Sequence, residues 1–338
     1  MKERKTFIIA EIGQAHEGSL GIAHSYIDAL AVTGVDAIKF QTHIAAAESS
    51  LQEPFRVKFS YEDKTRFDYW DRMSFTEEQW LGLKKHCDEV GLEFMSSPFS
   101  LAAVDVLERV GVKRYKIGSG EVSNFLILEK IAKTGKPIIL SSGMSSFAEI
   151  DETITFLKPF GNEISILQCT TSYPTPASRV GLNVVNELKN KYPNYTIGLS
   201  EHTAQIYTSI AAVAIGAEIL EFHAVFDQRM FGPDAKSSLT IDQITELVKG
   251  VRFTESMLNN PIDKSTSTEY TALKAIFEKS LAVNKTLKKG SVLTFNDLET
   301  TKPANCGISA AEFKKVIGKK LLVEKQQYTF LNWEDIEL

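Results

Sequence analysis

The chain has 338 residues, which is enough for a large core and more than one domain, and its composition is that of an ordinary globular protein. Its 38 basic and 43 acidic residues give a net charge of -5, which argues against binding nucleic acid through phosphate contacts. No apolar run reaches membrane-spanning length, so we expect neither a nucleic-acid nor a membrane partner. Three scattered cysteines, Cys87, Cys169 and Cys306, lack metal-site spacing and are predicted to be buried, reduced thiols of a cytoplasmic protein.

Short apolar segments with strand character alternate with amphipathic helical stretches from residue 6 to about residue 258. At the N-terminus, Glu11 breaks the apolar run early, which favours a first strand over a signal peptide. The predicted strands span residues 6–12, 36–41, 92–97, 114–119, 137–142, 164–169, 195–200 and 218–223. Because these strands are apolar almost throughout, we expect burial on both faces, which is typical of a parallel sheet.

Eight strand-and-helix units in about 250 residues match a closed (β/α)8 TIM barrel, which is the predicted α/β fold. A doubly wound sheet is the alternative, but EIGQAHEG lacks the glycine fingerprint of a dinucleotide-binding first turn. The barrel domain is assigned to residues 1–258, with a linker at 259–275 and a small, mostly β domain at 276–338. The polar and aromatic segment 42–78 is too long for a plain loop and predicts an elaborated connection at the barrel mouth.

Polar residues at the predicted strand ends are the candidate site residues, since the active site of a (β/α)8 barrel lies at the carboxyl ends of its strands. Such residues are costly to bury unless they face ligand and water. Ser96 and Ser142 are more simply explained as helix N-caps. The other candidates, in chain order, are Glu11, Lys39, Gln41, Ser97, Lys116, Ser119, Glu121, Ser141, Tyr173, Ser200, His202, Glu221, His223 and Asp234.

Two consecutive predicted strands end in histidine, at His202 and His223. Neighbouring strands lie about 4.8 Å apart, so the two imidazoles could share one divalent ion. Two histidines leave coordination positions open for water or substrate, which is typical of a catalytic metal site. A single histidine is more often packed or solvated. We expect that of His24, His43 and His86, and His16 is left open.

Lys39 and Lys116, with serines around them, predict an anion pocket. Lysines that extend from a strand end to the surface are the alternative. That alternative is weaker for Lys116 in KIGSGE, where glycines let the backbone approach a ligand. Glu11 and Glu121 are either acid/base groups or counter-charges to the lysines. These residues alone predict an anion-binding, metal-assisted barrel enzyme.

The motifs AEIGQAHEG, KFQT, SSPFS, KIGSGE, SSGM, YPTP, GLSEHT and EFH, followed by FGPD, cover most of residues 8–240. In this order they resemble the signature motifs of the sialic acid synthase family. The tail, from KSLAVNKTLKKGSVLTFNDL through CGIS to IGKKL, is similar to the antifreeze-like (SAF) domain attached to those enzymes.

This resemblance implies a condensation of phosphoenolpyruvate with an N-acetylated hexosamine, which releases phosphate and gives a nine-carbon 2-keto acid. It implies a divalent ion at His202 and His223, usually Mn²⁺, with Mg²⁺ or Co²⁺ possible. It also implies Glu121 as the acid/base group near the reacting carbons, with Glu11 as a second catalytic candidate. Phosphoenolpyruvate would be held by Lys39, Ser97, Lys116, Ser119, Ser141 and Ser200, and the sugar by Glu11, Gln41, Tyr173 and Asp234. A homodimer is expected, in which the tail of one chain covers the barrel mouth of the other.

The chain departs from the family pattern mainly on the sugar side. Ala15 and Thr171 stand where the family usually has Asn, and Phe222 stands in place of a lysine. Lys302 replaces an arginine that typically reaches the acetamido group, and it would lose the bidentate fork. The reaction class is therefore expected, while the acceptor sugar is open. The alternatives are the same condensation on another aldose, as in 3-deoxy acid synthases, or a non-catalytic carbohydrate-binding protein.

Overall fold

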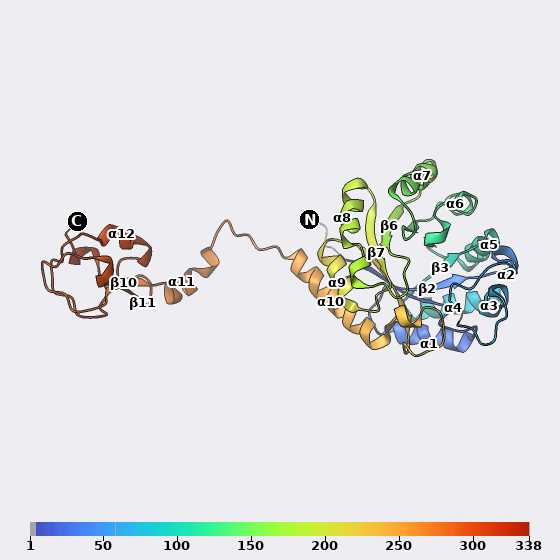
Figure 1. Cartoon of the computed structure of the whole chain (residues 1–338), viewed down its shortest axis with the longest axis horizontal. Coiled ribbons are helices and arrows are strands. Elements are labelled where there is room, and N and C mark those ends of the chain that lie inside the picture. Colours follow the sequence, from blue (N-terminus) through green and yellow to red (C-terminus); the bar gives the residue numbers. More distant parts are fainter. Residues whose placement is uncertain (1–4, 58, 338) are drawn as a thin grey trace. The chain divides into compact units, whose positions relative to one another are not determined.

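The computed structural model describes residues 5–57 and 59–337. These residues form two compact units, the first ending at Pro261 and the second beginning at Ile262. Figure 1 shows the elements of both units. In the part of the chain that is described, no helix is both long enough and apolar enough to cross a membrane.

The first unit is a barrel of parallel strands surrounded by helices, which confirms the predicted fold (Figure 1). The strands follow the hydrogen-bonded order β3-β2-β1-β8-β7-β6-β5-β4, and β3 contacts β4 to complete the ring. Each strand overlaps its predicted segment. Their bounds are β1 (Phe7–Gly13), β2 (Ala37–Thr42), β3 (Glu93–Pro98), β4 (Tyr115–Ile117), β5 (Ile138–Ser141), β6 (Ile164–Cys169), β7 (Thr196–Glu201) and β8 (Ile219–Val225), with a short β9 (Leu239–Thr240) beside β8.

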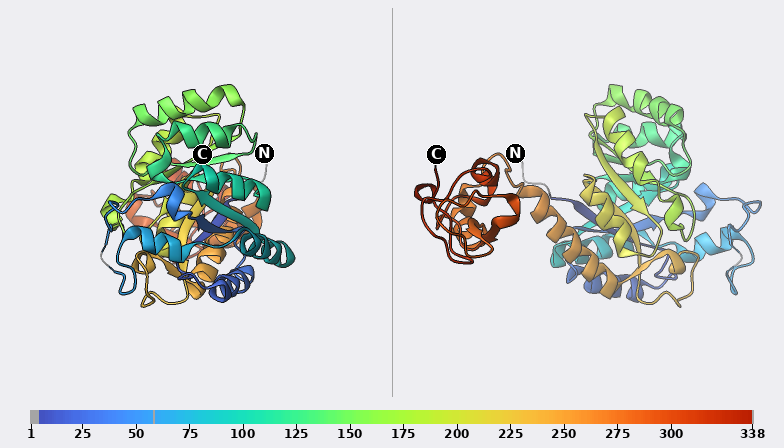
Figure 2. Two further views of the ribbon diagram at one scale, coloured as in Figure 1. Left: turned by 90° about the vertical axis from the view of Figure 1, so that its right-hand side faces the viewer. Right: turned by 60° about the vertical axis from the view of Figure 1, so that its left-hand side comes forward.

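One main helix follows each barrel strand, and the two views in Figure 2 show these helices packed around the sheet. Ser100 and Ser146 cap α5 and α7 by accepting hydrogen bonds from Ala103 N and Glu149 N. Ser96 and Ser142, predicted to be caps, do not cap these helices: Ser96 lies within β3, where its Oγ is 2.7 Å from Thr42 Oγ1, and Ser142 directly follows β5 and donates to the Leu167 carbonyl oxygen over 3.0 Å. The main helices are α1 (Leu20–Ala31), α4 (Glu77–Val90), α5 (Leu101–Val110), α6 (Phe125–Ala132), α7 (Phe147–Leu157), α8 (Leu182–Lys191), α9 (Ile206–Ala214) and α10 (Ile241–Asn259).

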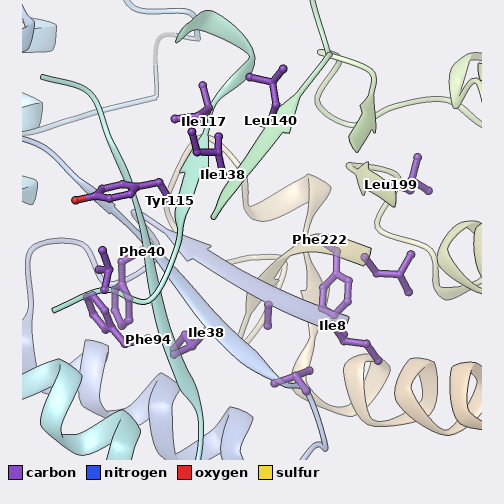
Figure 3. Close-up of a cluster of buried hydrophobic side chains, with 14 of the residues drawn as sticks. Ile8, Ile38, Phe40, Phe94, Tyr115, Ile117, Ile138, Leu140, Leu199 and Phe222 are labelled. Carbon is purple, nitrogen blue, oxygen red and sulfur yellow. The ribbon is translucent and has the colours of Figure 1, made fainter. Parts of the chain in front are cut away.

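The core has two parts because successive strand residues point to opposite faces of the sheet. Outward-facing side chains pack under the helices, and Figure 3 shows Phe40 and Phe94 side by side in that layer. Inward-facing side chains such as Ile9, Met95 and Ile139 fill the interior of the barrel. Two residues further along each strand, the same inward face becomes polar. These apolar side chains thus fill the amino-terminal end of the barrel, and the carboxyl end is lined by polar side chains.

The connection after β2 contains two short helices, α2 (Ala45–Glu48) and α3 (Arg66–Met73). It has a small core of its own, in which Phe55 and Phe59 pack against Tyr69, Trp70 and Met73. Burial of these aromatic side chains holds a long irregular segment in a defined path over the barrel mouth.

The second unit is small and has its own apolar core, which includes Leu281, Val283 and Leu293. Its strands β10 (Ser280–Val283) and β11 (Leu298–Thr301) form an antiparallel pair, with isolated bridges elsewhere. The helices of this unit are α11 (Thr271–Phe277) and α12 (Phe313–Val316). Most of α11 falls within the segment predicted to be a linker, so part of that segment is helical.

Candidate active site

A cavity of about 460 Å³ opens at the carboxyl ends of the barrel strands. All predicted site residues of the first unit lie on its wall, although they come from seven of the eight barrel strands and from the loops after β4, β6, β7 and β8. They are Glu11, Lys39, Gln41, Ser97, Lys116, Ser119, Glu121, Ser141, Tyr173, Ser200, His202, His223 and Asp234. The remaining predicted residue, Lys302, belongs to the second unit, where its Nζ lies 5.0 Å from the centre of the Phe277 ring.

Two buried lysines form the floor of the cavity. Lys39 Nζ lies 2.5 Å from Glu11 Oε1 and 3.7 Å from Glu221 Oε2, and Lys116 Nζ lies 3.3 Å from Glu221 Oε1. Ser200 donates to Glu221 Oε1 over 2.9 Å, and Lys39 donates to Ser97 Oγ over 3.4 Å. The two ammonium groups are therefore fixed by carboxylates and hydroxyls instead of extending to the surface.

The buried charges stabilise one another in their ionised forms. Burial alone would raise the pKa of Glu11, but the charges of Lys39, His223 and Lys116 together hold it far below its usual range. Burial alone would lower the pKa of Lys39, but Glu11 and Glu221 raise it. The floor of the cavity thus keeps fixed positive charge, which suits a strongly anionic substrate.

Ser119 opens a short 3-10 turn after β4, and a glycine on the neighbouring loop makes room for it. Gly143 N donates to Ser119 Oγ over 3.2 Å. A Cβ at Gly143 would lie 2.5 Å from both Ser119 Oγ and Thr171 Oγ1, and 3.0 Å from Cys169 Sγ. No residue larger than glycine fits there without moving the cavity wall.

Glu121 lies at the end of the same turn and is half-buried. Its Oε2 accepts a hydrogen bond of 2.7 Å from Asn124 Nδ2. Burial raises the pKa of Glu121, and the nearby charge of Glu48 adds to this effect, against the hydrogen bond from Asn124. A carboxyl group with a raised pKa can exchange a proton closer to neutral pH, as an acid/base group requires.

The two strand-end histidines are neighbours, with ring centres 5.3 Å apart. His202 Nδ1 lies 3.1 Å from the Thr170 carbonyl oxygen, which leaves Nε2 as the free ring nitrogen. Burial and the neighbouring His223 lower the pKa of His202 to about 4, so it is uncharged at neutral pH. Neutral imidazole with its second nitrogen bonded to a carbonyl is the usual form of a metal ligand, so the pair fits a divalent ion.

The two histidines would need water or substrate oxygens to complete such a site. In the described chain, no group of three or more His, Cys, Asp and Glu side chains could hold a metal ion by itself. His223 Nε2 also lies 3.7 Å from Glu11 Oε2, which links the pair to the charged floor.

The rim of the cavity beside His202 combines three loops. Tyr173 lies 4.2 Å from the His202 ring, centre to centre. The guanidinium of Arg56 covers the Tyr173 ring at 4.2 Å and donates from Nη2 to Asp234 Oδ1 over 2.6 Å. Arg56 was not predicted, although it lies in the segment expected at the barrel mouth.

Several lining residues escaped the sequence analysis because they are not at strand ends or lacked an assigned role. Glu221 was seen at a strand end but given no function, and His43 was expected to be packed or solvated. The structure buries His43 and places it on the cavity wall. The other unpredicted lining residues include Gln14, Glu48, Glu53, Arg66 and Trp70. Cys306, predicted to be buried, is exposed, whereas Cys87 and Cys169 are buried and all three thiols are free.

Known proteins with similar sequences and structures are synthases of the family that the sequence motifs indicate. The NeuB family model matches residues 26–290. The chain is 36% identical to N,N'-diacetyllegionaminic acid synthase of Campylobacter jejuni over 322 residues, covering 94% of this chain and 96% of that protein. It is 34% identical to N-acetylneuraminate-9-phosphate synthase of Homo sapiens over 324 residues, covering 95% and 90%. The crystal structure of N-acetylneuraminic acid (sialic acid) synthetase from Leptospira borgpetersenii, in complex with citrate, superposes with a TM-score of 0.71 at 29% identity, covering 80% of this chain and 90% of that one.

Proposed function

Since the chain belongs to the NeuB family and is a phosphoenolpyruvate-dependent condensing enzyme, we propose that its acceptor is an N-acetylated hexosamine. The products are a nine-carbon 2-keto acid and inorganic phosphate. Both relatives are named for products that carry N-acetyl groups, N,N'-diacetyllegionaminic acid and N-acetylneuraminate 9-phosphate, which supports an N-acetylated acceptor. The two products differ in the rest of the sugar, so an assay must identify the hexosamine.

The buried lysine floor is the observation that supports phosphoenolpyruvate as the donor substrate of this reaction. Lys39 and Lys116 are each 3% exposed or less, and both face the cavity. Phosphoenolpyruvate has two anionic groups, a carboxylate and a phosphate, that need fixed cations and hydroxyl donors. Ser97, Ser119, Ser141 and Ser200 supply the hydroxyls around the two ammonium groups.

The reaction balances with one water molecule. The methylene carbon of phosphoenolpyruvate bonds to the aldehyde carbon of the sugar, and the aldehyde oxygen takes up a proton. Water adds to the carbon that carries the phosphate ester, and the bond from this carbon to the bridging oxygen breaks to release phosphate. The main contribution of the floor is to fix phosphoenolpyruvate with its methylene carbon beside the aldehyde carbon of the bound sugar. The reaction between two substrates then becomes effectively unimolecular.

His202 and His223 are the residues that would hold a divalent ion, with Mn²⁺ as the proposed metal and Mg²⁺ or Co²⁺ as alternatives. Such an ion supplies Lewis-acid polarisation of the aldehyde oxygen. The protein's own contribution is the orientation of His202 by the Thr170 carbonyl and the proximity of Glu11 to His223.

Glu121 is the proposed acid/base group, and Glu11 the second catalytic candidate beside the reacting carbons. Gln41, Tyr173 and Asp234 are proposed to contact the sugar. These three residues come from β2 and from the loops after β6 and β8, so the acceptor would lie across the cavity, above the lysine floor.

The decisive experiment measures phosphate release from phosphoenolpyruvate with a panel of N-acetylated hexosamines and with non-acetylated aldoses. We expect turnover only with N-acetylated acceptors, and loss of turnover after exhaustive chelation with recovery on adding Mn²⁺. The Lys116→Met variant should lose phosphoenolpyruvate binding. The proposal fails if aldoses without an acetamido group are used equally well, or if no acceptor in the panel supports phosphate release.

The assembly and the tail are further proposals. We propose that the second unit is an SAF-type domain, that the protein acts in the cytoplasm as a homodimer, and that Lys302 contributes to the sugar site of the partner chain. Sedimentation at assay concentration tests the dimer. For Lys302→Met, a raised KM for the sugar with an unchanged KM for phosphoenolpyruvate supports the role, and equal changes in both contradict it.

A further inference from the structure

His43 is a buried histidine on the cavity wall that the proposed mechanism does not use. It continues the inward-facing row of β2, after Lys39 and Gln41 at alternate positions. Its exposed fraction is only 3%. The ring is stacked between Trp70, 3.8 Å away, and Phe99, 4.8 Å away, measured between ring centres. Two parallel neighbours leave the imidazole free to make contacts only through its edge.

Both edge nitrogens of His43 have partners. Nδ1 lies 2.6 Å from Glu48 Oε1, and Nε2 lies 2.9 Å from Gln14 Nε2 and 3.1 Å from Gln41 Oε1. A carboxylate only accepts hydrogen bonds, so Glu48 requires the proton on Nδ1. Nε2 is then an acceptor that receives one N–H of Gln14, and Gln41 Oε1 lies near it as a second acceptor because it receives the other N–H of the same amide. Glu48 itself is held in place because Ile44 N donates to its other oxygen over 3.3 Å.

The contacts continue from His43 to the charged floor. Gln14 donates from the same Nε2 to Gln41 Oε1, which fixes the direction of the Gln41 amide. Gln41 Nε2 then donates to Glu11 Oε1 over 2.8 Å, and Glu11 pairs with Lys39. A reversed Gln41 amide would place its oxygen against the Glu11 carboxylate, which is repulsive.

We propose that His43 and Glu48 are positioning residues: Glu48 fixes the tautomer of His43, and His43 thereby sets the amide directions of Gln14 and Gln41 at the acceptor end of the cavity. This inference rests on the proposed function, because Gln41 is proposed to contact the sugar. One amide hydrogen of Gln41 is used by Glu11, and the other is left for a sugar oxygen. Phosphoenolpyruvate, held by the lysines and serines, lies beyond Glu11 at the far end of this chain of contacts, so it should depend on His43 much less than the acceptor does.

Two substitutions at His43 separate positioning from simple space filling. In His43→Gln the side-chain oxygen reaches the place of Nε2 and still accepts from Gln14, whereas His43→Asn reaches only the place of Nδ1. We expect His43→Asn to raise the KM for the acceptor by about tenfold, the loss of roughly one hydrogen bond. His43→Gln should stay close to wild type, and the KM for phosphoenolpyruvate should be unchanged in both.

The matched control is His86→Gln, the same substitution on α4 outside the cavity, which should leave both KM values unchanged. If His43 only fills the space between Trp70 and Phe99, the Gln and Asn variants will be equally impaired, or both substrates will be affected alike. Either result overturns the inference.

A second readout does not depend on the acceptor or on turnover. In ¹⁵N-histidine-labelled protein, the His43 signals, assigned by their loss in His43→Gln, should report the Nδ1–H tautomer. Glu48→Gln supplies an amide that can donate to Nδ1, so it should move the ring toward the Nε2–H tautomer. An Nε2–H ring in wild type contradicts the inference even if the proposed function is correct. If no sugar supports turnover, the proposed function fails while this measurement still decides the tautomer.

Discussion

Lys39 and Glu11 form an ion pair at the bottom of the cavity, with Nζ 2.5 Å from Oε1 and side chains only 2% and 6% exposed. Removing two charges from water is costly, and the cost is recovered only where further polar partners surround the pair. Glu221 provides that surrounding, since it approaches both Lys39 and Lys116 from β8. The positive floor is therefore held in position before any substrate binds, which is the arrangement that electrostatic catalysis requires.

Glu221→Gln tests this arrangement. The substitution keeps the size of the side chain but removes the negative charge between the two lysines. We expect kcat to fall by about tenfold or more, because the ammonium groups lose their fixed positions. Inorganic phosphate should inhibit more strongly, because a negative charge within a few ångströms of the anion is gone. Initial rates and phosphate inhibition constants measure both effects.

Glu218→Gln is the matched control for this experiment. Glu218 is exposed and lies just before β8, at the opposite end of the strand from the cavity. It should behave as wild type. Unchanged kcat together with weaker phosphate inhibition in Glu221→Gln would show that Glu221 does not organise the lysines.

Gly143→Ala adds one methyl group to the wall of the cavity. The new Cβ would lie 2.5 Å from Ser119 Oγ and from Thr171 Oγ1, so at least one of these hydroxyls must move. The protein should fold, because the backbone at Gly143 is not left-handed. We expect the KM for phosphoenolpyruvate to rise by about tenfold through the displaced Ser119.

Gly82→Ala controls for the methyl group itself. Gly82 lies within α4, and a Cβ there would meet no atom within 4 Å. Alanine in a helix interior should raise the free energy of unfolding by about 0.5–1 kcal/mol and leave catalysis unchanged. Wild-type kinetics in Gly143→Ala would show that the cavity wall can accommodate the methyl group without displacing Ser119 from its binding position.

The sequence predicts the barrel and the strand-end residues because both follow from local patterns. A residue two positions beyond an inward-facing apolar side chain faces the same way, so Glu11 follows Ile9 and Ser97 follows Met95 into the cavity. Parallel strands in a closed barrel then bring these ends together from distant parts of the chain.

Residues outside that pattern were missed for physical reasons. Arg56 enters the site through a loop whose path depends on the packing of Phe55 and Phe59. The hydrophobic periodicity of the sequence does not reveal such packing. His43 continues the β2 row, but its role depends on Gln14 and Glu48 from other segments. Ser96 and Ser142 were mistaken for caps because the sequence does not show where each strand ends: Ser96 is still within β3, and the caps are the later serines Ser100 and Ser146.

Arg56→Lys tests the acceptor end of the cavity. Lysine keeps the positive charge but loses the planar guanidinium that covers Tyr173 at 4.2 Å while donating from Nη2 to Asp234. Both partners are proposed sugar contacts, so we expect the KM for the acceptor to rise by about tenfold with little change for phosphoenolpyruvate. Arg229→Lys is the control, since Arg229 forms a similar pair with Asp227 on the exposed surface. A larger effect on phosphoenolpyruvate than on the acceptor would assign Arg56 to the other substrate.

His16 makes the stability of the barrel depend on pH. Burial, together with the nearby charge of Arg72, lowers the pKa of His16 to about 3, well below the usual range of a histidine. Below about pH 6.5 the unfolded chain takes up a proton at this residue and the folded chain does not. Stability should therefore fall as the pH decreases from 6.5 toward 3, by up to about 1.4 kcal/mol per pH unit from this group.

His16→Asn removes this dependence while keeping the local hydrogen bond. His16 Nδ1 accepts from Gly18 N over 3.1 Å, and an asparagine oxygen can take its place. At pH 7.5 the variant should be less stable than wild type, because the ring contact with Phe75 at 4.7 Å is lost. As the pH is lowered, the difference should shrink, since only wild type loses the stability linked to His16. Urea unfolding of both proteins at pH 7.5, 6 and 5 measures the difference. Parallel stability curves would mean that His16 is protonated in the folded barrel and that its burial has no linked cost.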